Sequence, residues 1–464
     1  MTSRRAAFDT PPAPGVAAEN GRSARGGRGA SRVVITGMGW ITPLGDDIER
    51  VWKRLLNGES GVGKTTLFDA STFPTTFSGQ VRDFDLARYI GAAAAARHKD
   101  ASRNAQFAMG AARMAWDSAG LDKADGLDRT RVGIYLGGGE GPIDFFNFAE
   151  AAIRGWNAEA NGGKGDLATV RWAEVAYQKL DAVRELEQDP NMAAGHLACL
   201  FGIQGPTLNT LTACAASTQA IGEATNLIRR GDADVIVSGG THSMLHPFGL
   251  TGFNRLTALS TRNDDYTSAS RPFDLTRDGF VLSEGSGILI LEEYEHARRR
   301  GAATLAEIVG YGSTADAFRV TDIHETGRGA MAAMRQAIEE SGLGLRDIHY
   351  ISAHGTGTQE NDKIESLAIS KVFGEWAPKV PVSSVKSMLG HLIAAAGAVE
   401  LITCVLAIRD NTLPPTTNYR NPDANCPLDY VPNKARKARV DNVMSNSLGF
   451  GGQNNSLIIR RVTN

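Results

Sequence analysis

Three side chains of this 464-residue chain have the chemical types and the sequence surroundings that nucleophilic catalysis requires. Cys214 follows the apolar stretch 207–212 and precedes a small-residue run that predicts a helix, so unpaired N–H groups and the helix dipole would stabilise its thiolate. His354 lies in the loop HGTGT, whose glycines let a ligand approach the backbone, and His391 begins another small-residue helix. Together these residues predict a cysteine nucleophile served by two histidines.

Each of these residues also has an ordinary structural explanation. A lone cysteine is more often a small buried hydrophobic residue, which is what we expect of Cys199, Cys404 and Cys426. A lone histidine is often a hydrogen-bonded core residue. An internal repeat favours the catalytic interpretation, because it places all three segments at equivalent ends of sheet strands, where α/β active sites gather.

The repeat is a pattern of apolar strands and glycine-terminated helices that occurs twice. The first copy has its predicted elements at 105–119, 131–139, 207–212 and 234–238, and the second at 330–341, 348–353, 380–384 and 392–408. Strands that are apolar along their whole length and alternate with helices belong in parallel sheets covered on both faces. We therefore expect an α/β fold of five layers, built from two β-α-β-α-β halves.

The chain divides into an extension and these two halves. Residues 1–31 are rich in arginine, glycine, alanine and proline and lack the apolar core of a signal peptide, so they predict a disordered extension. The N-terminal half is expected at 32–300 and the C-terminal half at 301–464. An insert at about 141–192 interrupts the first half, and its apolar spacing predicts one amphipathic helix over 166–187.

The composition excludes several classes of protein. The 49 basic and 51 acidic residues give a net charge of −2, which offers no general attraction for nucleic acid or for an acidic membrane. No apolar run reaches the roughly 20 residues of a membrane span. Four cysteines without a Cys-x-x-Cys pair favour a reducing cytoplasm.

One motif has to be rejected. Residues 58–65 (GESGVGKT) match the phosphate-loop pattern letter for letter. A phosphate loop connects a buried strand to a helix, so that helical N–H groups point at the phosphates. Here a predicted helix at 47–57 precedes the motif, and Pro74 with several threonines opposes a helix after it. We therefore do not expect nucleotide binding at this segment.

Six motifs make the chain resemble the β-ketoacyl-[acyl-carrier-protein] synthases of the type II, elongating group. They are TACAAS (212–217), RPFD (271–274), DGFV (278–281), HGTGT (354–358), KSMLGH (386–391) and NSLGFGG (446–452). The similarity extends from about residue 32 to the C-terminus. It implies a thiolase-like fold, an acyltransferase of fatty acid, polyketide or polyene biosynthesis, acyl carrier protein as partner, and a homodimer or a heterodimer with a paralogous chain-length subunit.

The resemblance also implies roles for the three residues. Cys214 would take an acyl chain from carrier-protein phosphopantetheine as a thioester, with the N–H groups of Cys214 and Phe450 as the oxyanion hole. Malonyl-carrier protein would then lose CO₂, and the neutral imidazoles of His354 and His391 would donate hydrogen bonds to the resulting enolate. This carbon–carbon bond formation needs no metal and no redox cofactor.

Other residues would support this site by the same analogy. Lys386 would act structurally and electrostatically, held near Glu365 of the segment that starts at Asp362, and Glu400 would orient the site behind His391. A solvated helix face is the alternative for these acids, because exposed Lys and Glu are the rule. The pantetheine arm would hydrogen bond to two threonines. These are Thr356 and Thr358.

Two departures from the family pattern concern substrate preference. Phe450 resembles the family's mobile gate, but Leu448 stands where elongating enzymes often have phenylalanine, so the gate is expected to move differently. The insert at 141–192 is longer than in housekeeping members and lies where the family forms its dimer interface and acyl pocket. A specialised pathway is one reading of both features, and a peripheral decoration is the alternative for the insert.

Three rival activities fit less well. A thiolase needs a second cysteine near the C-terminus, and 449–452 has none. A chain-length partner subunit lacks the nucleophile, whereas Cys214 and both histidines are present here. A starter-type synthase pairs its cysteine with histidine and asparagine, a pattern that Asn446 alone does not supply.

Overall fold

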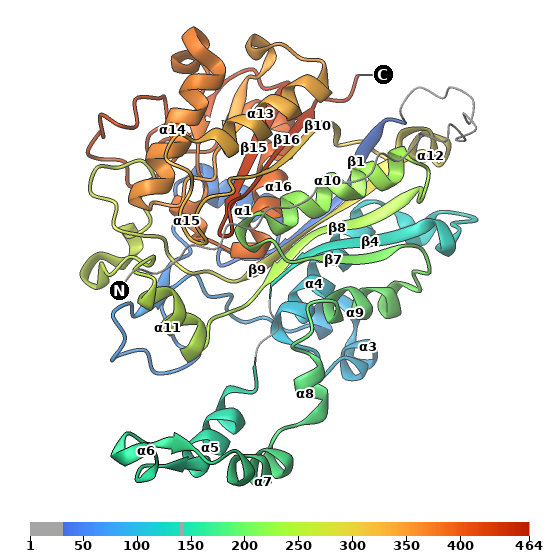
Figure 1. The fold of residues 1–464 in the computed structure, drawn as a ribbon. Helices are drawn as coiled ribbons and strands as arrows, with labels where there is room; N and C mark the ends of the chain where they lie inside the picture. Colours follow the sequence, from blue (N-terminus) through green and yellow to red (C-terminus); the bar gives the residue numbers. More distant parts are fainter. Residues whose placement is uncertain (1–30, 140–142, 464) are drawn as a thin grey trace, which may run out of the picture. The chain divides into compact units, whose positions relative to one another are not determined.

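The computed structural model describes residues 31–139 and 143–463, and ten of its strands form one mixed sheet (Figure 1). One half of this sheet contains, in spatial order, β7 (Thr207–Thr210), β4 (Val132–Gly138), β8 (Val235–His242), β9 (Gly285–Glu293) and β1 (Val33–Ile41). The other half contains β12 (Val382–Ser383), β11 (Tyr350–Ser352), β15 (Asn442–Gly449), β16 (Gln453–Arg460) and β10 (Ala306–Ala315). The halves join where β1 pairs with β10.

Strand directions show the repeat directly. In each half the first three strands run parallel and the last two are antiparallel to their neighbours. Only β9 and β16 therefore run opposite to the other four strands of their halves, and for these two strands the expectation of parallel sheets was wrong. Burial on both faces, which the apolar runs encode, does not determine direction. For β16 the connection determines the direction, because the three-residue link from β15 permits only an antiparallel pair.

Helices form three layers around the two sheet halves. Helices α10 (Ala216–Arg229) and α16 (Ala396–Asp410) contact each other between the halves. The outer face of the first half is covered by α4 (Arg103–Ser118) and α9 (Met192–Phe201), and that of the second by α13 (Arg328–Ser341) and α14 (Gln359–Phe373). This confirms the predicted five layers. Every residue of α16 from 396 to 408 is buried, as a helix between two sheets requires.

The outer helices approach their central strands closely because glycines face them. A Cβ at Gly37 or Gly39 of β1 would lie 2.1 or 2.2 Å from carbonyl oxygens of α4. A Cβ at Gly310 or Gly312 of β10 would lie 2.1 or 2.0 Å from carbonyl oxygens of α13. The two halves thus use the same pair of glycines for the same contact.

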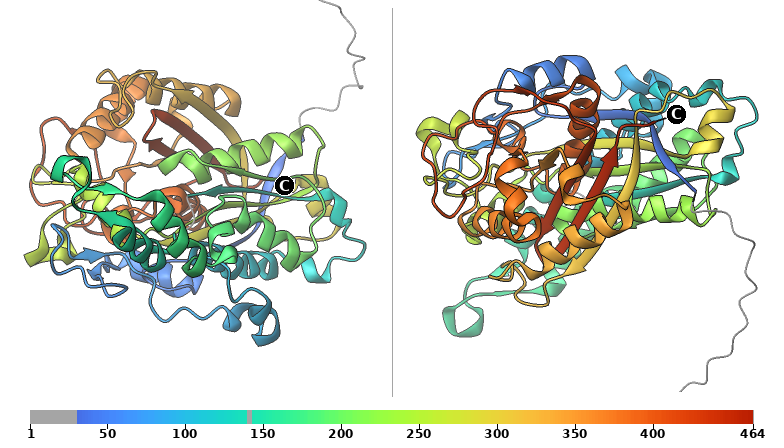
Figure 2. Two further views of the ribbon diagram at one scale, coloured as in Figure 1. Left: turned by 60° about the horizontal axis from the view of Figure 1, so that its bottom comes forward. Right: turned by 90° about the horizontal axis from the view of Figure 1, so that it is seen from above.

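The insert forms an arm of short elements at the bottom of Figure 1, seen from another side in Figure 2. Its elements are α5 (Phe145–Gly155), β5 (Trp156–Asn157), α6 (Ala160–Gly163), β6 (Asp166–Leu167), α7 (Thr169–Lys179) and α8 (Ala182–Leu186). The prediction of one helix over 166–187 was wrong. The chain is extended at Leu180, and Asp181 caps a new helix by accepting the N–H groups of Val183 and Arg184.

The arm packs on itself and on helix α11 (Pro247–Arg255) through aromatic rings. Helix α5 lies against α7, and Phe145 and Phe148 contact Phe248 of α11 with ring centroids 5.1 and 5.9 Å apart. Several large apolar side chains of the arm nevertheless remain exposed. They are Phe146 and Ile153 on α5, Trp156 on β5, Val170 and Tyr177 on α7, and Val183 and Leu186 on α8.

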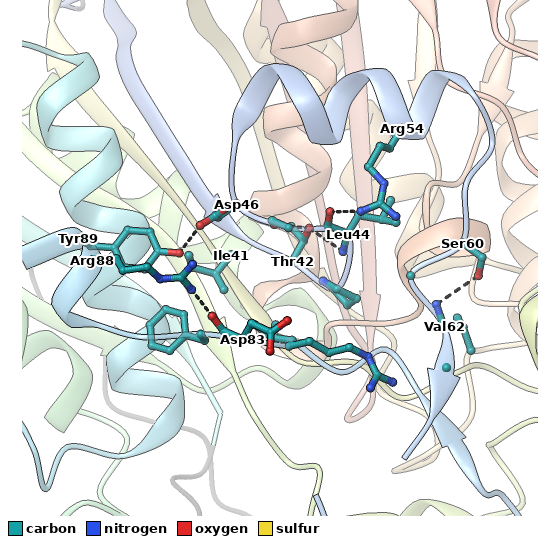
Figure 3. Close-up of a pocket in the computed structure, with 17 residues that line it drawn as sticks. Ile41, Thr42, Leu44, Asp46, Arg54, Ser60, Val62, Asp83, Arg88 and Tyr89 are labelled. Atoms are coloured by element: carbon teal, nitrogen blue, oxygen red, sulfur yellow. Dashed lines mark hydrogen bonds between the residues drawn. The ribbon is translucent and has the colours of Figure 1, made fainter. Parts of the chain in front are cut away.

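The segment 58–65 lacks the surroundings of a phosphate loop, as expected. Helix α1 (Ile48–Leu56) precedes it, and its Gly63–Lys64 forms a two-residue strand paired with Phe77–Ser78. Figure 3 shows the neighbouring hollow, where Arg54 donates to the carbonyl of Leu44 and Arg88 to that of Asp83. These guanidinium groups are already engaged by the backbone.

Two expectations concern the ends of the chain and membranes. Apart from Ser31, the predicted extension 1–31 lies outside the described residues. Among the residues that are described, no helix combines the length and the apolar character needed to cross a membrane.

Candidate active site

Cys214 lies in a tight turn between a strand and a helix, as predicted. The 3-10 turn Ala213–Ala215 connects β7 to α10, and Ala213 has a φ of 47°, a left-handed conformation that is uncommon for a residue with a Cβ. Such a conformation persists only where the surrounding structure enforces it, and it often marks a functional site. The thiol is 5% exposed.

His354 follows β11 in a loop that a buried carboxylate holds in place. Glu365 of α14 accepts the backbone N–H groups of His354 and Gly355, both at 2.8 Å. Burial raises the pKa of Glu365 to about 7, against the effect of these two N–H groups. Glu365 therefore positions the backbone of the loop.

His391 follows the short helix α15 (Lys386–Leu389) and has a defined tautomer. Its Nδ1 accepts the N–H of Ile393 at 3.2 Å, so the ring proton lies on Nε2. That Nε2 is buried and has no partner among the described residues. The ring packs against the edge of Phe280, with centroids 5.1 Å apart. His391 thus presents an unused donor.

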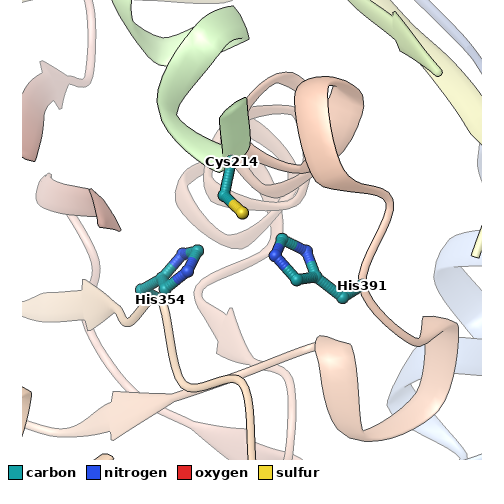
Figure 4. A group of neighbouring side chains, drawn as sticks. All are labelled: Cys214, His354 and His391. Carbon is teal, nitrogen blue, oxygen red and sulfur yellow. The ribbon is translucent and has the colours of Figure 1, made fainter. Parts of the chain in front are cut away.

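The three predicted residues come together in space, although they are up to 177 positions apart in the chain. One atom from each, the sulfur of Cys214 and a ring nitrogen of His354 and of His391, all lie within 4.8 Å of one another. The two rings are 5.3 Å apart and nearly perpendicular. Figure 4 shows the thiol pointing toward the space between them. Both histidines are buried.

Lys386 contacts the site through His354. Its Nζ donates to the carbonyl of His354 at 2.7 Å and lies 3.3 Å from the Nδ1 of the same ring. An ammonium has only protons to offer, so that Nδ1 acts as the acceptor and Nε2 carries the ring proton. His354 and His391 therefore both carry their ring proton on Nε2.

The partner of Lys386 differs from the expected one. Its Nζ forms an ion pair with Glu400 of α16, and both side chains are about 2% exposed. Lys386 was expected to lie near Glu365, and its charge does oppose the rise in the pKa of that carboxyl group. Glu400 was expected to orient the site behind His391. Burial raises the pKa of Glu400 to about 7, while Lys386 opposes that shift.

The site keeps its histidines neutral and its thiol protonated. Burial, together with Lys386, lowers the pKa of both His354 and His391 well below 6.5. Burial raises the pKa of Cys214 to about 11, although Lys386 and the N–H groups of Phe450 and Cys214 lower it. The predicted stabilisation of the thiolate by N–H groups is present, but the cost of burial exceeds it.

The same two N–H groups define an anion-binding position. Those of Phe450 and Cys214 both lie within hydrogen-bonding reach of the Cys214 sulfur. Phe450 stands in the turn that joins β15 to β16, next to Gly449, Gly451 and Gly452. A carbonyl oxygen of a thioester on Cys214 would lie near both donors.

Two hollows meet at Cys214 and Phe450. One, of about 80 Å³, is lined by both histidines and by Thr356 and Thr358, whose Oγ atoms are 3.0 Å apart. The other, of about 410 Å³, also has Cys214 and Phe450 in its lining. Its lining comprises Gly139, Leu211, Thr212, Ala213, His242, Met244, Phe253, Ile393, Ala394, Gly451 and Gln453.

Asp362 shapes the threonine loop without lining either hollow. Its carboxylate accepts the N–H of Gly357 at 3.1 Å and that of Phe273 at 2.7 Å. Arg277 lies 3.7 Å away, and burial raises the pKa of Asp362. Asp362 therefore positions the loop between Thr356 and Thr358.

Several lining residues were not found from the sequence. Around the first hollow these are Phe280, Thr321, Asp322, Ile323, Glu360 and Asn361. Phe280 belongs to the motif DGFV, and Asn361 immediately precedes Asp362. Their position in or beside a family motif could therefore have identified both as residues of the site. The segment 321–323 has no such signal, because an irregular loop brings it to the site.

Within the described residues, Cys214, His354 and His391 also form the one group of three ligand-type side chains close enough to share a metal ion. Each of the three already has a role in this site, Cys214 as the thiol and the two histidines as hydrogen-bond donors. The expectation of a metal-free reaction stays a prediction.

Family models match most of the chain. Residues 30–297 match the model of the beta-ketoacyl synthase N-terminal domain, and residues 305–420 match that of the C-terminal domain. The 3-oxoacyl-[acyl-carrier-protein] synthase 2 of Coxiella burnetii is 41% identical over 439 residues, covering 93% of this chain and 99% of that protein. The Staphylococcus aureus protein of the same name is 39% identical and covers 93% and 98%.

Solved structures agree in fold. A chain in the complex of a type II polyketide synthase acyl-carrier protein with its ketosynthase bound to the hexaketide has a TM-score of 0.80 and 34% identity, covering 94% of this chain and all of that one. The ishigamide ketosynthase/chain length factor gives the same values. A beta-ketoacyl synthase from Burkholderia phymatum gives 0.81 and 32%, covering 93% of this chain and all of that one. The predicted thiolase-like fold is confirmed.

Proposed function

Because the chain belongs to the β-ketoacyl synthase family, we propose that it condenses malonyl-carrier protein with an acyl chain held on Cys214, with loss of CO₂, in fatty acid or polyketide biosynthesis. The observation that carries this proposal is that one thiol sulfur and a ring nitrogen from each of two histidines lie within 4.8 Å of one another, where two hollows join. The enzyme is an acyltransferase.

In the first half-reaction the sulfur of Cys214 attacks the thioester carbonyl of an acyl-carrier protein. The oxyanion that forms accepts hydrogen bonds from the N–H groups of Cys214 and Phe450. The bond to the pantetheine sulfur breaks, and that sulfur takes the proton that the Cys214 thiol gives up. The acyl chain then occupies the larger hollow.

In the second half-reaction a malonyl thioester enters the smaller hollow and its carboxylate leaves as CO₂. The electron pair of the broken bond forms an enolate, whose oxygen accepts the Nε2–H groups of His354 and His391. The enolate carbon attacks the acyl thioester, and the sulfur of Cys214 leaves as a thiolate that takes a proton from solvent. The product is a 3-oxoacyl-carrier protein.

Neutral histidines suit this step better than charged ones. Two imidazolium ions beside Lys386 would repel each other, whereas neutral rings donate while leaving Lys386 to balance Glu400. We assign Lys386 and Glu400 as positioning residues for the tautomer of His354, and Glu365 and Asp362 as positioning residues for its loop.

The carrier's arm would pass through the smaller hollow. The hydroxyl groups of Thr356 and Thr358 face that hollow and would hydrogen bond to the pantetheine amides. Phe450 lines both hollows and would act as a gate between them, next to Gly451 and Gly452. Acyl groups arrive on the carrier, so the chemistry written above needs no further cofactor.

We further propose a dimer, either of two copies or with a paralogous chain-length subunit. The strand β7 lies at the edge of the sheet, where Leu208 and Leu211 are 42% and 50% exposed. An unpaired edge with exposed leucines is suited to pairing with another chain. The exposed apolar side chains of the arm would extend the same interface. The four cysteines are free, consistent with the cytoplasm; Cys404 and Cys426 are buried as expected, whereas Cys199 is exposed.

A direct test supplies the purified enzyme with an acyl-carrier protein and then with malonyl-carrier protein. Intact-protein mass spectrometry should show first an acyl group on Cys214 and then a 3-oxoacyl group on the carrier. Acylation of Cys214 without any later 3-oxoacyl product would contradict the proposal, as would a product formed by the Cys214→Ala variant.

A further inference from the structure

The larger hollow has apolar walls and a polar patch that the reaction described above does not use. Met244, Phe253 and Ile393 supply apolar surface, as an acyl chain requires. His242, Thr212 and Gln453, whose side chains contain nitrogen or oxygen atoms, also line this hollow. An alkyl chain has no group that could hydrogen bond to them.

His242 is the most unusual member of this patch. It is the last residue of β8 and is 1% exposed, yet neither of its ring nitrogens has a hydrogen-bond partner in the described part of the chain. The Oγ1 of Thr212 is likewise without a partner there. Buried polar groups in native proteins are nearly always paired, so these atoms are available to something that occupies the hollow.

The backbone around His242 keeps its ring in place. A Cβ at Gly139 would lie 2.4 Å from its Nδ1, so the ring rests directly on the backbone after β4. On the strand side, His242 pairs with Gly285 of β9. The ring is therefore held by a strand and by a glycine contact, which gives a fixed direction to any hydrogen bond that it makes.

The protonation state of the His242 ring limits the groups to which it can hydrogen bond. Burial lowers the pKa of His242 to about 3, with a smaller contribution from His246, so the ring is neutral at physiological pH. A neutral imidazole has one donor and one acceptor. It matches a hydroxyl group or a ketone and offers no charge to a carboxylate.

We propose that His242 is a specificity-determining residue that hydrogen bonds to a hydroxyl or ketone oxygen on the acyl chain held by Cys214. This inference rests on the proposed condensation and names the substrate class: oxygen-bearing chains are selected over fully reduced ones. A site with buried polar groups rejects an analogue that leaves them unpaired far more strongly than an apolar pocket rejects a change in size.

The test compares acyl chains of one length that differ in a single oxygen. Octanoyl-carrier protein and its 3-, 5- and 7-hydroxy and 3-, 5- and 7-oxo derivatives are supplied singly. The kcat/KM for acylation of Cys214 is then measured by intact-protein mass spectrometry. We expect at least one oxygenated chain to react tenfold or more faster than octanoyl.

Two variants of His242 and one control assign that preference to its ring. His242→Leu should bring the ratio to within about twofold of unity, and His242→Gln, which keeps a donor and an acceptor, should keep part of it. His296→Leu removes a histidine that bonds to Glu292, outside both hollows, and should keep the wild-type ratio.

Three outcomes would overturn the proposal while leaving the condensation intact. These are octanoyl reacting as fast as every oxygenated chain in the wild-type enzyme, a preference that survives in His242→Leu, and loss of the preference in the control. If His242→Leu fails to fold, the wild-type ratio and His242→Gln still decide. No acylation of Cys214 by any chain would instead refute the proposed function.

Discussion

The two halves of the molecule share one backbone device and use it for different purposes. In the first half the 3-10 turn Ala213–Ala215 precedes α10, and Ala213 has a φ of 47°. In the second half the 3-10 turn Ile393–Ala395 precedes α16, and Ile393 has a φ of 46°. The position that is Cys214 in one turn is Ala394 in the other. Both turns therefore have the same backbone geometry, and only the thiol of Cys214 makes the first one reactive.

The loops at the strand ends differ more than the turns. In the second half, nine residues from Ser384 to Leu392 separate β12 from its turn, and they include Lys386 and His391. In the first half, only Leu211 and Thr212 separate β7 from its turn. The loop after β11 carries His354, while the chain after β4 leads into the arm. The first half thus provides the nucleophile and the arm. The second half provides the two histidines that donate hydrogen bonds and the buried ion pair of Lys386 and Glu400.

The largest effect is expected when the thiol is moved from the turn of the first half to that of the second, which tests whether only the first turn can hold the nucleophile. Cys214→Ala should reduce condensation at least 10³-fold, because no other group can hold the acyl chain, while malonyl decarboxylation persists. Adding Ala394→Cys should not restore condensation, since the N–H of Phe450 contacts the first turn. Product formation by the double variant above the Cys214→Ala level would show that the turns are interchangeable.

Removing a donor of the second half should separate the two half-reactions. His354→Ala and His391→Ala should each lower decarboxylation by about 10²–10³-fold, the usual cost of losing one oxyanion donor. Acylation of Cys214 should fall much less, because the enolate forms only in the second step. Rapid-quench kinetics measure the rate of each step separately. A variant that acylates poorly but decarboxylates normally would refute the role of that histidine as a donor to the enolate.

The buried ion pair of Lys386 and Glu400 should have two separable effects, one on the stability of the fold and one on decarboxylation through His354. Lys386→Met leaves Glu400 buried without a partner and should cost about 3–5 kcal/mol of stability. Adding Glu400→Gln should recover most of that stability but not the decarboxylation rate, because His354 still lacks the ammonium at its Nδ1. Chemical denaturation and single-turnover kinetics measure the two effects. Recovery of both together would mean that Lys386 acts only on folding.

Stability should also depend on pH through Glu365. Its pKa of about 7 lies above the ordinary 4.5, so its contribution to stability is complete below about pH 4.5 and is lost as the pH rises through 7. Relative to Glu365→Gln, the wild type should lose up to about 3 kcal/mol over that range, since one pKa unit corresponds to about 1.4 kcal/mol. Urea denaturation from about pH 5 to 8 measures this difference. A difference that stays constant would contradict it.

The smallest effect on chemistry is expected from the arm. Replacing Tyr177, which is 95% exposed, and Val170, which is 75% exposed, with serine should weaken assembly, because both apolar side chains would be covered by a partner. The single-turnover rate should stay within about twofold when the protein is concentrated enough to assemble. Sedimentation at several concentrations provides the comparison. An unchanged assembly would favour the view of the arm as a peripheral decoration.

The sequence predicts best what local pattern encodes. The repeat, its glycine stops and the three residues of the site follow from apolar spacing and from motifs at strand ends. It predicts poorly what depends on contacts between distant segments. The direction of β9, the pairing of Lys386 with Glu400 and the placement of His242 are all set by tertiary structure. The break in the arm helix is a different case, because Asp181 is a recognisable capping residue that regular apolar spacing concealed.

One measurement tests the division of labour between the halves most directly. The enzyme is first acylated on Cys214, freed of excess substrate, and mixed with malonyl-carrier protein labelled with ¹³C in its free carboxyl group. We predict one labelled CO₂ and one unlabelled 3-oxoacyl-carrier protein for each acyl group lost from Cys214, with both yields falling together in His354→Ala and His391→Ala. Label retained in the product, or product formed without loss of the acyl group from Cys214, would contradict the account.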